Sequence, residues 1–391
     1  MESSALIGFL SALVAALLVV SFMHPKVVKF AKRRNVVDNP NARKLQKNPI
    51  PVMGGVAVFF GLIAGLCVST IFFDINTLLP MFVAMSVMLC VGVADDVSGL
   101  SPWLRFAIEI VMVFMIMFIT NMSLNNLHGL WGYTELPNWI SIPLTIVAVV
   151  GMINAINLID GVDGLSSGFC ILASVAFGIL FLKAGDTAML LLCLLSIGAL
   201  LPFFFHNVFG VKSKMFIGDG GSLMMGVVMS SYVVTAINSG NECSAFAASG
   251  NFGLVAFTLA VMCVPVFDTV RVMAMRILRR TSPFHPDKTH LHHLFIELGF
   301  SHVGTTISVL TINVIVVLLW YLVYKLGGSA DMQFYVVMAS GIVLTAGFYK
   351  FMRIQIVRQT ALYRFAQRIG HKTHVAEKKG WLALQRLVDF R

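Results

Sequence analysis

Four clusters of acidic, amide or histidine side chains interrupt a sequence that is otherwise strongly apolar. They are the pair Asp95-Asp96, residues 154–164, residues 216–222 and residues 290–293. Each cluster lies at or just beyond the end of an apolar run of roughly membrane-spanning length. Carboxylates beside hydrocarbon are costly, so four such clusters on one face of a bilayer would indicate an active site.

The segment 154–164 carries the most specific pattern. It places Asn154, Asn157, Asp160 and Asp163 three residues apart. This spacing aligns the four side chains along one side of a helical or near-helical turn. Amide and carboxylate oxygens suit Mg²⁺, and they can also accept hydrogen bonds from a nucleotide. The alternative interpretation is an Asx-rich capping turn that leads into the next apolar run.

The other two acidic clusters offer similar chemistry. Asp95 and Asp96 end an apolar run, and adjacent helical positions point about 100° apart, so both carboxylates can face one polar cavity. Neighbouring carboxylates favour a cation or a basic partner, although both could simply be solvated at the interface. Asp219 lies among glycines at the start of another run, where the free N–H groups of a helix can bind phosphate.

Histidine and lysine side chains in two polar loops are candidates for anion contacts. His290, His292 and His293 lie in the long loop 276–302. Zinc is the alternative there, but no Cys or carboxylate spacing completes a zinc site, so contact with a diphosphate or sugar is favoured. Lys47 lies in an earlier basic loop and could bind a lipid phosphate, or contribute only to membrane orientation.

The composition determines the class of protein that must position these residues. Of 391 residues, 58% are hydrophobic and only 12% are charged, whereas soluble proteins carry about 25% charged residues. We expect an all-α polytopic membrane domain over residues 1–352. Its eleven predicted transmembrane helices lie at 5–23, 52–73, 78–94, 104–120, 138–156, 167–183, 187–205, 220–237, 252–274, 304–325 and 333–351.

The distribution of basic residues predicts the orientation. If successive spans alternate, all of the 28 Lys and Arg residues except Lys183 and Lys325 lie on one side. By the positive-inside rule, that side is the cytoplasm, the amino terminus lies outside, and the carboxyl terminus lies inside. The net charge of +10 then reflects orientation and attraction to anionic lipid headgroups, and no nucleic-acid module is visible.

The basic tail, residues 353–391, differs from the apolar core. It contains an apolar stripe made of Trp381, Leu382, Leu384, Leu387 and Val388. Such a stripe predicts an amphipathic helix at the membrane surface, or a contact in a homodimer. On this view, deletion of the residues after Arg358 weakens membrane or self-association more than chemistry.

The motifs together resemble those of the polyprenyl-phosphate N-acetylhexosamine-1-phosphate transferases, in glycosyltransferase family 4. The resemblance covers about the first 350 residues. It rests on the Asp95-Asp96 pair and on the strings PNARK, PVMGG, NAINLIDGVDGL, FIGDGGS and SPFHPDKTHLHH. The His-Leu-His-His pattern resembles the WecA/TagO-type branch, because the muramyl-pentapeptide branch typically has three successive histidines.

The resemblance implies a reaction. The phosphate of undecaprenyl phosphate attacks the β-phosphorus of a UDP-N-acetylhexosamine, with GlcNAc as the expected sugar. UMP leaves, and the lipid-linked sugar diphosphate initiates synthesis of a cell-envelope polysaccharide. Mg²⁺, with Mn²⁺ as an alternative, is the expected cofactor. The expected location is the bacterial inner membrane, with the active site facing the cytoplasm.

The resemblance also implies roles for individual residues. Asn157 and Asp219 are expected to bind Mg²⁺. Catalytic roles, which include activation or positioning of the lipid phosphate by Asp95, are expected for Asp95, Asp96, Asp160 and Asp163. Substrate contacts, which include stacking of Phe216 on uracil, are expected for Lys47, Asn154, Asn207, Phe216, His290, His292 and His293. Direct attack by the lipid phosphate is favoured over a covalent aspartyl intermediate, because that phosphate needs only deprotonation and alignment.

Two other classes of protein could place acidic residues beside apolar runs. A secondary transporter uses intramembrane carboxylates for ion coupling, but usually near the middle of the bilayer and with inverted repeats. Neither feature is evident here. A lipid-binding scaffold would not require the clustered Asn and Asp residues. Release of UMP from a UDP-sugar distinguishes an enzyme from both.

Overall fold

The computed structural model describes residues 3–38, 49–248, 250–282, 288–376 and 378–389. In these ranges nearly all of the regular secondary structure is helical, as the apolar runs predicted. The only sheet of the described residues pairs two short antiparallel strands, β1 (Val37–Asp38) with β2 (Ile50–Pro51). The prediction of an all-α polytopic membrane protein is confirmed.

Nine helices in the described residues are long and apolar enough to cross a membrane. The last of them is continuous over Ala330–Arg358, because a π-helical turn (Val343–Gly347) joins α14 to α15. The component helices are α1 (Ser3–Arg33), α3 (Leu79–Ser98), α4 (Pro102–Thr120), α5 (Asn138–Leu158), α6 (Leu165–Ala184), α7 (Thr187–Phe209), α8 (Gly218–Ile237), α13 (His302–Lys325), α14 (Ala330–Ile342) and α15 (Phe348–Arg358).

Two further predicted spans have unusual forms. The run 252–274 is broken into α10 (Leu254–Val261) and α11 (Cys263–Leu278), which are bent by 76°. The run 52–73 contains only the 16-residue helix α2 (Gly54–Ser69). Each of the eleven runs therefore contains a helix or a helix pair, and the number of actual crossings stays a prediction. The short helices α9 (Glu242–Ala248) and α12 (Leu291–Glu297) were not predicted.

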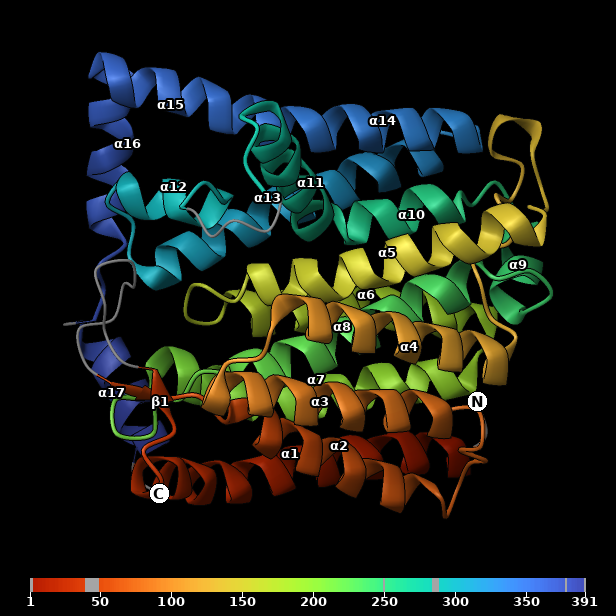
Figure 1. The fold of residues 1–391 in the computed structure, drawn as a ribbon, viewed down its shortest axis with the longest axis horizontal. Coiled ribbons are helices and arrows are strands. Elements are labelled where there is room, and N and C mark those ends of the chain that lie inside the picture. Colours follow the sequence, from red (N-terminus) through yellow and green to blue (C-terminus); the bar gives the residue numbers. More distant parts are fainter. Residues whose placement is uncertain (1–2, 39–48, 249, 283–287, 377, 390–391) are drawn as a thin grey trace.

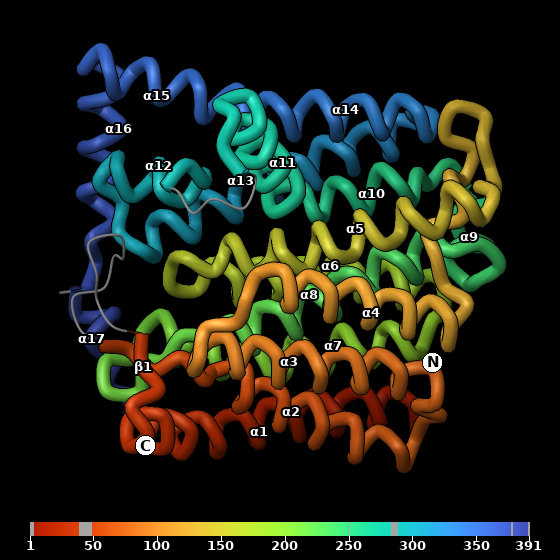
Figure 2. The backbone as a smooth tube through the Cα atoms, viewed as in Figure 1, coloured from red at the N-terminus to blue at the C-terminus, as the bar shows by residue number. Residues whose placement is uncertain are grey.

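Most long helices lie alongside one another, so the bundle has two distinct ends (Figure 1). One end carries β1, α12 and the last two helices, α16 (Ala361–Lys372) and α17 (Lys379–Asp389). The opposite end carries α9 and the amino terminus. The tube view shows that α16 runs across the ends of the bundle helices rather than along them (Figure 2).

Helix α8 forms the centre of the bundle, and all of its residues except Asp219 are buried. Its first turn lies in backbone contact with α2 and α3 at two pairs of glycines. A Cβ atom on Gly55 would lie 2.3 Å from the Cα of Gly221, and one on Gly92 would lie 2.3 Å from the backbone nitrogen of Gly220. The glycines at 220 and 221 therefore allow close helix packing, which the sequence analysis had not considered.

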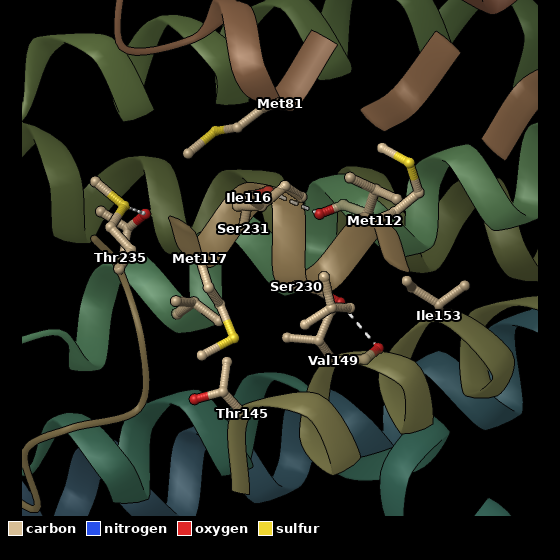
Figure 3. Close-up of a pocket in the computed structure, with 14 residues that line it drawn as sticks. Met81, Met112, Ile116, Met117, Thr145, Val149, Ile153, Ser230, Ser231 and Thr235 are labelled. Atoms are coloured by element: carbon tan, nitrogen blue, oxygen red, sulfur yellow. Dashed lines mark hydrogen bonds between the residues drawn. The ribbon is translucent and has the colours of Figure 1, made fainter. Parts of the chain in front are cut away.

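Two cavities in the bundle have apolar linings. A small one, of about 30 Å³, lies between α3, α4, α5 and α8 and is lined by side chains such as Met81, Met112 and Ile153 (Figure 3). A larger groove, of about 500 Å³, lies beside the bend between α10 and α11. Its lining includes Val147 and Val270, which are 71% and 60% exposed, so the groove opens on the outer surface of the bundle.

The tail packs against the bundle rather than forming a separate unit. The predicted boundary at 352/353 lies inside α15, and the chain leaves the bundle only after that helix. Trp381 of α17 contacts Phe209 of α7, with ring centroids 4.6 Å apart. The apolar stripe of the tail lies on α17, and both α16 and α17 lie at the end of the bundle that carries the acidic residues.

Candidate active site

One cleft of about 460 Å³ collects most of the acidic and amide side chains singled out in the sequence. The carboxyl-terminal ends of α3 and α5 and the amino-terminal end of α8 meet at this cleft. The predicted site residues that line the cleft are Asp95, Asp96, Asn157, Asp160, Asp163, Asn207, Phe216, Asp219 and His293. Four clusters that are distant in sequence therefore share one cavity.

Asp219 and Asn157 form the link between α8 and α5. The side-chain amide of Asn157 donates a hydrogen bond of 2.8 Å to Oδ1 of Asp219 and another of 2.9 Å to the hydroxyl of Ser222. These bonds orient the amide so that its nitrogen faces α8. The side-chain carbonyl oxygen of Asn157 and Oδ2 of Asp219 take no part in these bonds and are the atoms that could bind a ligand.

Asp95 is anchored by a neighbouring cation. Its Oδ2 accepts a bond of 3.1 Å from Arg105, and its Oδ1 accepts one of 2.7 Å from the backbone N–H of Leu100. Arg105 also lies 3.4 Å from the side-chain oxygen of Asn154 and 3.7 Å from Glu109. The charged side chains behind Asp95 therefore form one connected network.

The second acidic residue of the pair faces the start of α8. The Oδ2 atom of Asp96 lies 3.5 Å from the backbone nitrogen of Gly220. Gly218, with a φ of +74°, makes this approach possible, because a Cβ there would lie 2.6 Å from the same carboxylate oxygen and 2.3 Å from the backbone oxygen of Val52. Position 218 therefore requires glycine for two reasons: its backbone has a positive φ, and there is no room for a Cβ atom.

Asp160 is surrounded by other carboxyl groups. Burial raises the pKa of Asp160 well above its usual value, and the negative charges of Asp219, Asp96 and Asp163 raise it further. A cation placed among these groups would remove that repulsion. The arrangement therefore favours binding of a positive ion in the cleft.

Asp163 has the opposite electrostatic environment. Its Oδ2 accepts a bond of 2.6 Å from Lys214 and lies 2.8 Å from Nδ1 of His302. Burial alone would raise the pKa of Asp163, but the hydrogen bonds and charges of His302 and Lys214 outweigh burial and hold the pKa below its usual value. Asp163 is therefore an ionised carboxylate that holds two basic side chains at one side of the cleft.

The three histidines of the loop have different surroundings. His293 lines the cleft. His290 is buried, and its Nδ1 lies 2.9 Å from Asp268, which also pairs with Arg271 at 2.6 Å. His292 is buried as well. Burial and the neighbouring histidines His293 and His290 hold the pKa of His292 well below its usual value, so its ring is neutral.

These positions divide the predicted histidine contacts into two groups. His293 is placed to meet a substrate. His290 and His292 lie beneath the surface and support the loop, with Nε2 of His292 close to the backbone of Gly161. Asp268 contacts both His290 and Arg271, so it joins this loop to α11.

Three predicted substrate-binding residues remain: two of them make contacts within the protein, and the third lies outside the described residues. Asn207 lines the cleft, but its side chain accepts from the N–H of Gly164 at 2.6 Å and donates to the carbonyl of Met215 at 2.9 Å, so it fixes two loops. Asn154 lies one turn behind the cleft and donates to Glu109 at 2.6 Å. Lys47 lies outside the described residues.

The basic side chains that pair with the acidic ones carry little signal in the sequence. Arg105, Lys214 and His302 belong to none of the four clusters from which the site was predicted. Lys214 stands two residues before Phe216 in the same loop, which was the one available signal. No sequence pattern linked His302 to Asp163, because Asp163 lies in the turn between α5 and α6 whereas His302 begins α13, far along the chain.

The donor atoms of the cleft suit a hard divalent cation. Asp219, Asn157 and the neighbouring carboxylates supply oxygen, and sulfur is absent from the cleft lining. Within the described ranges, no three His, Cys, Asp or Glu side chains are grouped so as to hold a metal by themselves. Mg²⁺ is commonly bound by one or two carboxylates together with substrate phosphates and water, so the residues fit that ion.

Comparison with known proteins identifies the family. The model of the family "Glycosyl transferase family 4" matches residues 78–237. The chain is 31% identical over 311 residues to a probable undecaprenyl-phosphate N-acetylglucosaminyl 1-phosphate transferase of Bacillus subtilis. The aligned residues cover 79% of this chain and 82% of the relative.

Two relatives from other bacteria give similar values. The undecaprenyl-phosphate alpha-N-acetylglucosaminyl 1-phosphate transferase of Pasteurella multocida is 31% identical over 302 residues, which cover 76% of this chain and 80% of the relative. The protein of the same name from Haemophilus influenzae is 32% identical over 273 residues, which cover 68% and 73%. The matched segment 78–237 contains the cleft residues of α3, α5 and α8. The chain therefore belongs to glycosyltransferase family 4.

Proposed function

We propose that this protein transfers GlcNAc-1-phosphate from UDP-GlcNAc to undecaprenyl phosphate, with release of UMP. The observation that carries the proposal is the convergence of Asp95, Asp96, Asp160 and Asp219 on one cleft, together with Asn157. The relatives named above act on undecaprenyl phosphate by their names. The product, a lipid-linked sugar diphosphate, would initiate a cell-envelope polysaccharide.

Asp219 and Asn157 are the residues that would hold Mg²⁺. When bound, the ion neutralises the diphosphate and stabilises the charge that develops on the UMP leaving group. Asp96 and Asp160, which lie beside Asp219, would shape the same end of the cleft. Their negative charges keep the site empty of anions until a cation and its phosphate ligand arrive together.

The remaining side chains position the two substrates. Asp95 is held in one orientation by Arg105 and Leu100, so it can align the acceptor phosphate and accept its proton. Phe216 offers an aromatic face in the lining of the cleft, where uracil could stack. His293 can donate a hydrogen bond to the sugar or diphosphate.

The apolar groove beside the α10–α11 bend suits the lipid acceptor. Its lining is almost entirely apolar, and it includes Ala155, which lies two residues before the cleft residue Asn157. A polyprenyl chain in this groove would remain in contact with the bilayer, while its phosphate approached the cleft. This arrangement supports a reaction between a water-soluble donor and a membrane-bound acceptor.

The site is proposed to face the cytoplasm of the bacterial inner membrane. The basic side chains Lys32, Lys212 and Lys214 lie around the same end of the bundle as the cleft. Basic residues accumulate on the cytoplasmic side of membrane proteins. A sugar nucleotide made in the cytoplasm would therefore reach the cleft directly from water.

The test is turnover by the purified protein in detergent. UMP release should require UDP-GlcNAc, undecaprenyl phosphate and Mg²⁺, and chelation of the metal should stop it. A panel of UDP-sugars would establish the donor. A transporter or a lipid-binding scaffold would release no UMP under any of these conditions, and that result would reject the proposal.

A further inference from the structure

We propose that residues 361–376 and 378–389, here named the C-terminal strap, form part of the binding site for the sugar nucleotide. The strap fixes two basic side chains at the cleft and forms the outer wall of a second cavity that adjoins it. This inference rests on the proposed function, because it assigns that cavity to the donor substrate. It replaces the expectation that the tail serves association more than chemistry.

One end of the strap is anchored through Asp389 in α17. The carboxylate accepts bonds from the backbone N–H groups of Val211, Lys212 and Ser213, at 3.0, 3.2 and 3.0 Å, and from the hydroxyl of Ser213 at 2.7 Å. These residues immediately precede Lys214 in the loop between α7 and α8. The anchor therefore fixes the loop that brings Lys214 to Asp163.

The other anchor lies just after α16. The hydroxyl of Thr373 accepts a bond of 2.9 Å from the backbone N–H of Ser301, and the hydroxyl of Ser301 donates one of 2.8 Å to the carbonyl of Thr373. The ring of His374 lies 3.1 Å from the carbonyl of Gly299. Ser301 precedes His302, so this anchor fixes the second basic partner of Asp163.

Each anchor fixes a segment that carries one basic partner of Asp163. Lys214 and His302 both contact the same oxygen of Asp163, at 2.6 and 2.8 Å. They come from segments that are about ninety residues apart in the chain, and the strap bridges those segments across the end of the bundle (Figure 1).

A cavity of about 500 Å³ lies between the strap and the cleft. Its inner wall includes Asp163 and Phe216, which also line the cleft. Its outer wall includes Thr373, His374 and Trp381 of the strap. The two cavities therefore share a boundary, and a ligand that extends out of the cleft would meet the strap.

The chemistry of this cavity matches a nucleoside diphosphate. Lys32 and Lys214 supply positive charge, and Phe209, Phe216 and Trp381 supply aromatic faces. Cationic and aromatic groups together suit a ligand that carries phosphate and a planar base. The acceptor, in contrast, would bind through the apolar groove near α10 and α11, which the strap does not line.

The kinetic test separates the two substrates. In detergent with Mg²⁺, Asp389→Ala should raise the KM for UDP-GlcNAc about tenfold and leave the KM for undecaprenyl phosphate unchanged, because only donor binding is weakened. Thr373→Val should act in the same direction, and Thr373→Ser should restore the wild-type value because it keeps the hydroxyl.

Asp331→Ala is the matched control. Asp331 also accepts a bond from a distant backbone N–H, that of Trp131, at 2.7 Å, but at the opposite end of the bundle. Because Trp131 lines the apolar groove near α10 and α11, the comparison uses the donor substrate alone, and Asp331→Ala should leave the KM for UDP-GlcNAc unchanged. The inference is wrong if Asp389→Ala leaves the KM for UDP-GlcNAc and the KM for undecaprenyl phosphate unchanged. It is also wrong if the only effect of Asp389→Ala is a fall in kcat that matches the loss of folded protein.

A binding measurement makes the inference independent of turnover. Titration with UDP-GlcNAc, without acceptor, should change the intrinsic tryptophan fluorescence of the wild type but not that of Trp381→Phe. An identical response in both proteins would overturn the inference. Absence of UMP release by the wild type would count against the proposed function, and the fluorescence titration would then still decide whether the strap meets the nucleotide.

Discussion

At the scale of single residues, the cleft contains two electrostatic regions. Asp160 and Asp219 lie where negative charges repel one another, and this region favours a cation. Asp163 lies about one turn away in sequence and is neutralised by Lys214 and His302. The same residue type therefore serves different purposes, according to whether its neighbours are acidic or basic.

Replacement of Asp219 tests the cation region. Asp219→Asn keeps the size of the side chain but removes its charge, so we expect turnover to fall by about 10² to 10³-fold, as for loss of one electrostatic group in an active site. UMP release and thermal stability in detergent should be measured together, with Asp331→Asn as the control. Near-normal turnover with normal stability would remove Asp219 from the metal site.

Replacement of Asp163 tests the neutralised region through its pH dependence. The folded-state pKa of Asp163 is lowered, so ionisation of this group stabilises the fold above the unfolded pKa, and the stabilisation is lost as pH falls through the folded pKa. The melting temperature of Asp163→Asn should thus lie below that of the wild type between about pH 8 and pH 5. The difference should shrink below about pH 4. A difference that is independent of pH would contradict this account.

At the scale of elements, small residues decide how closely three helices approach. Gly55 and Gly92 meet the backbone of α8 at Gly221 and Gly220. This contact places the ends of α3 and α8 side by side, and it brings Asp96 and Asp219 to one cleft. The geometry of the site therefore depends on packing inside the bundle as well as on the acidic residues.

Enlargement of one of these glycines should disturb the site from a distance. Gly92→Ala would place a Cβ 2.3 Å from the nitrogen of Gly220, and overpacking of this kind costs about 1–3 kcal/mol. We expect a lower melting temperature and reduced turnover. Gly151→Ala is the control, because nothing lies within 4 Å of its Cβ position. Equal stability of the two variants would show that α3 and α8 can separate freely.

At the scale of the whole molecule, the cleft has two different approaches. The cavity under the C-terminal strap carries charged and aromatic side chains and lies at the end of the bundle, whereas the groove beside α10 and α11 is almost entirely apolar and lies on its side. An enzyme that transfers a sugar phosphate from a nucleotide to a lipid phosphate, as proposed, needs both. The groove lies beside the 76° bend between α10 and α11, a feature that a bundle of straight helices would lack.

Partial filling of the apolar groove should affect only one substrate. Gly151 lines the groove, with open space where a side chain would stand. Gly151→Phe should therefore raise the KM for undecaprenyl phosphate and leave the KM for UDP-GlcNAc unchanged. Gly151→Ala, which adds little volume, should resemble the wild type. A rise in the KM for the donor instead would mean that the groove does not hold the acceptor.

The sequence by itself determined the class of protein, the helical runs and most of the acidic cleft. Apolar runs must be buried in lipid or protein as helices, because lipid cannot satisfy backbone polar groups. Acidic residues at their ends are costly enough to indicate function. These are local properties of the chain, so the Asp95-Asp96 pair and the segment 154–164 could be interpreted without a fold.

Only the tertiary structure decided which side chains meet. The three-residue spacing predicted one shared face for the segment 154–164, but α5 ends at Leu158, so Asn154 faces Glu109 while Asp160 and Asp163 follow a turn into the cleft. The pairing of Asp163 with Lys214 and His302, and the docking of the strap through Asp389, join segments far apart in the chain. Such contacts depend on how whole helices pack. The spacing of residues within one segment does not determine which distant segment packs against it.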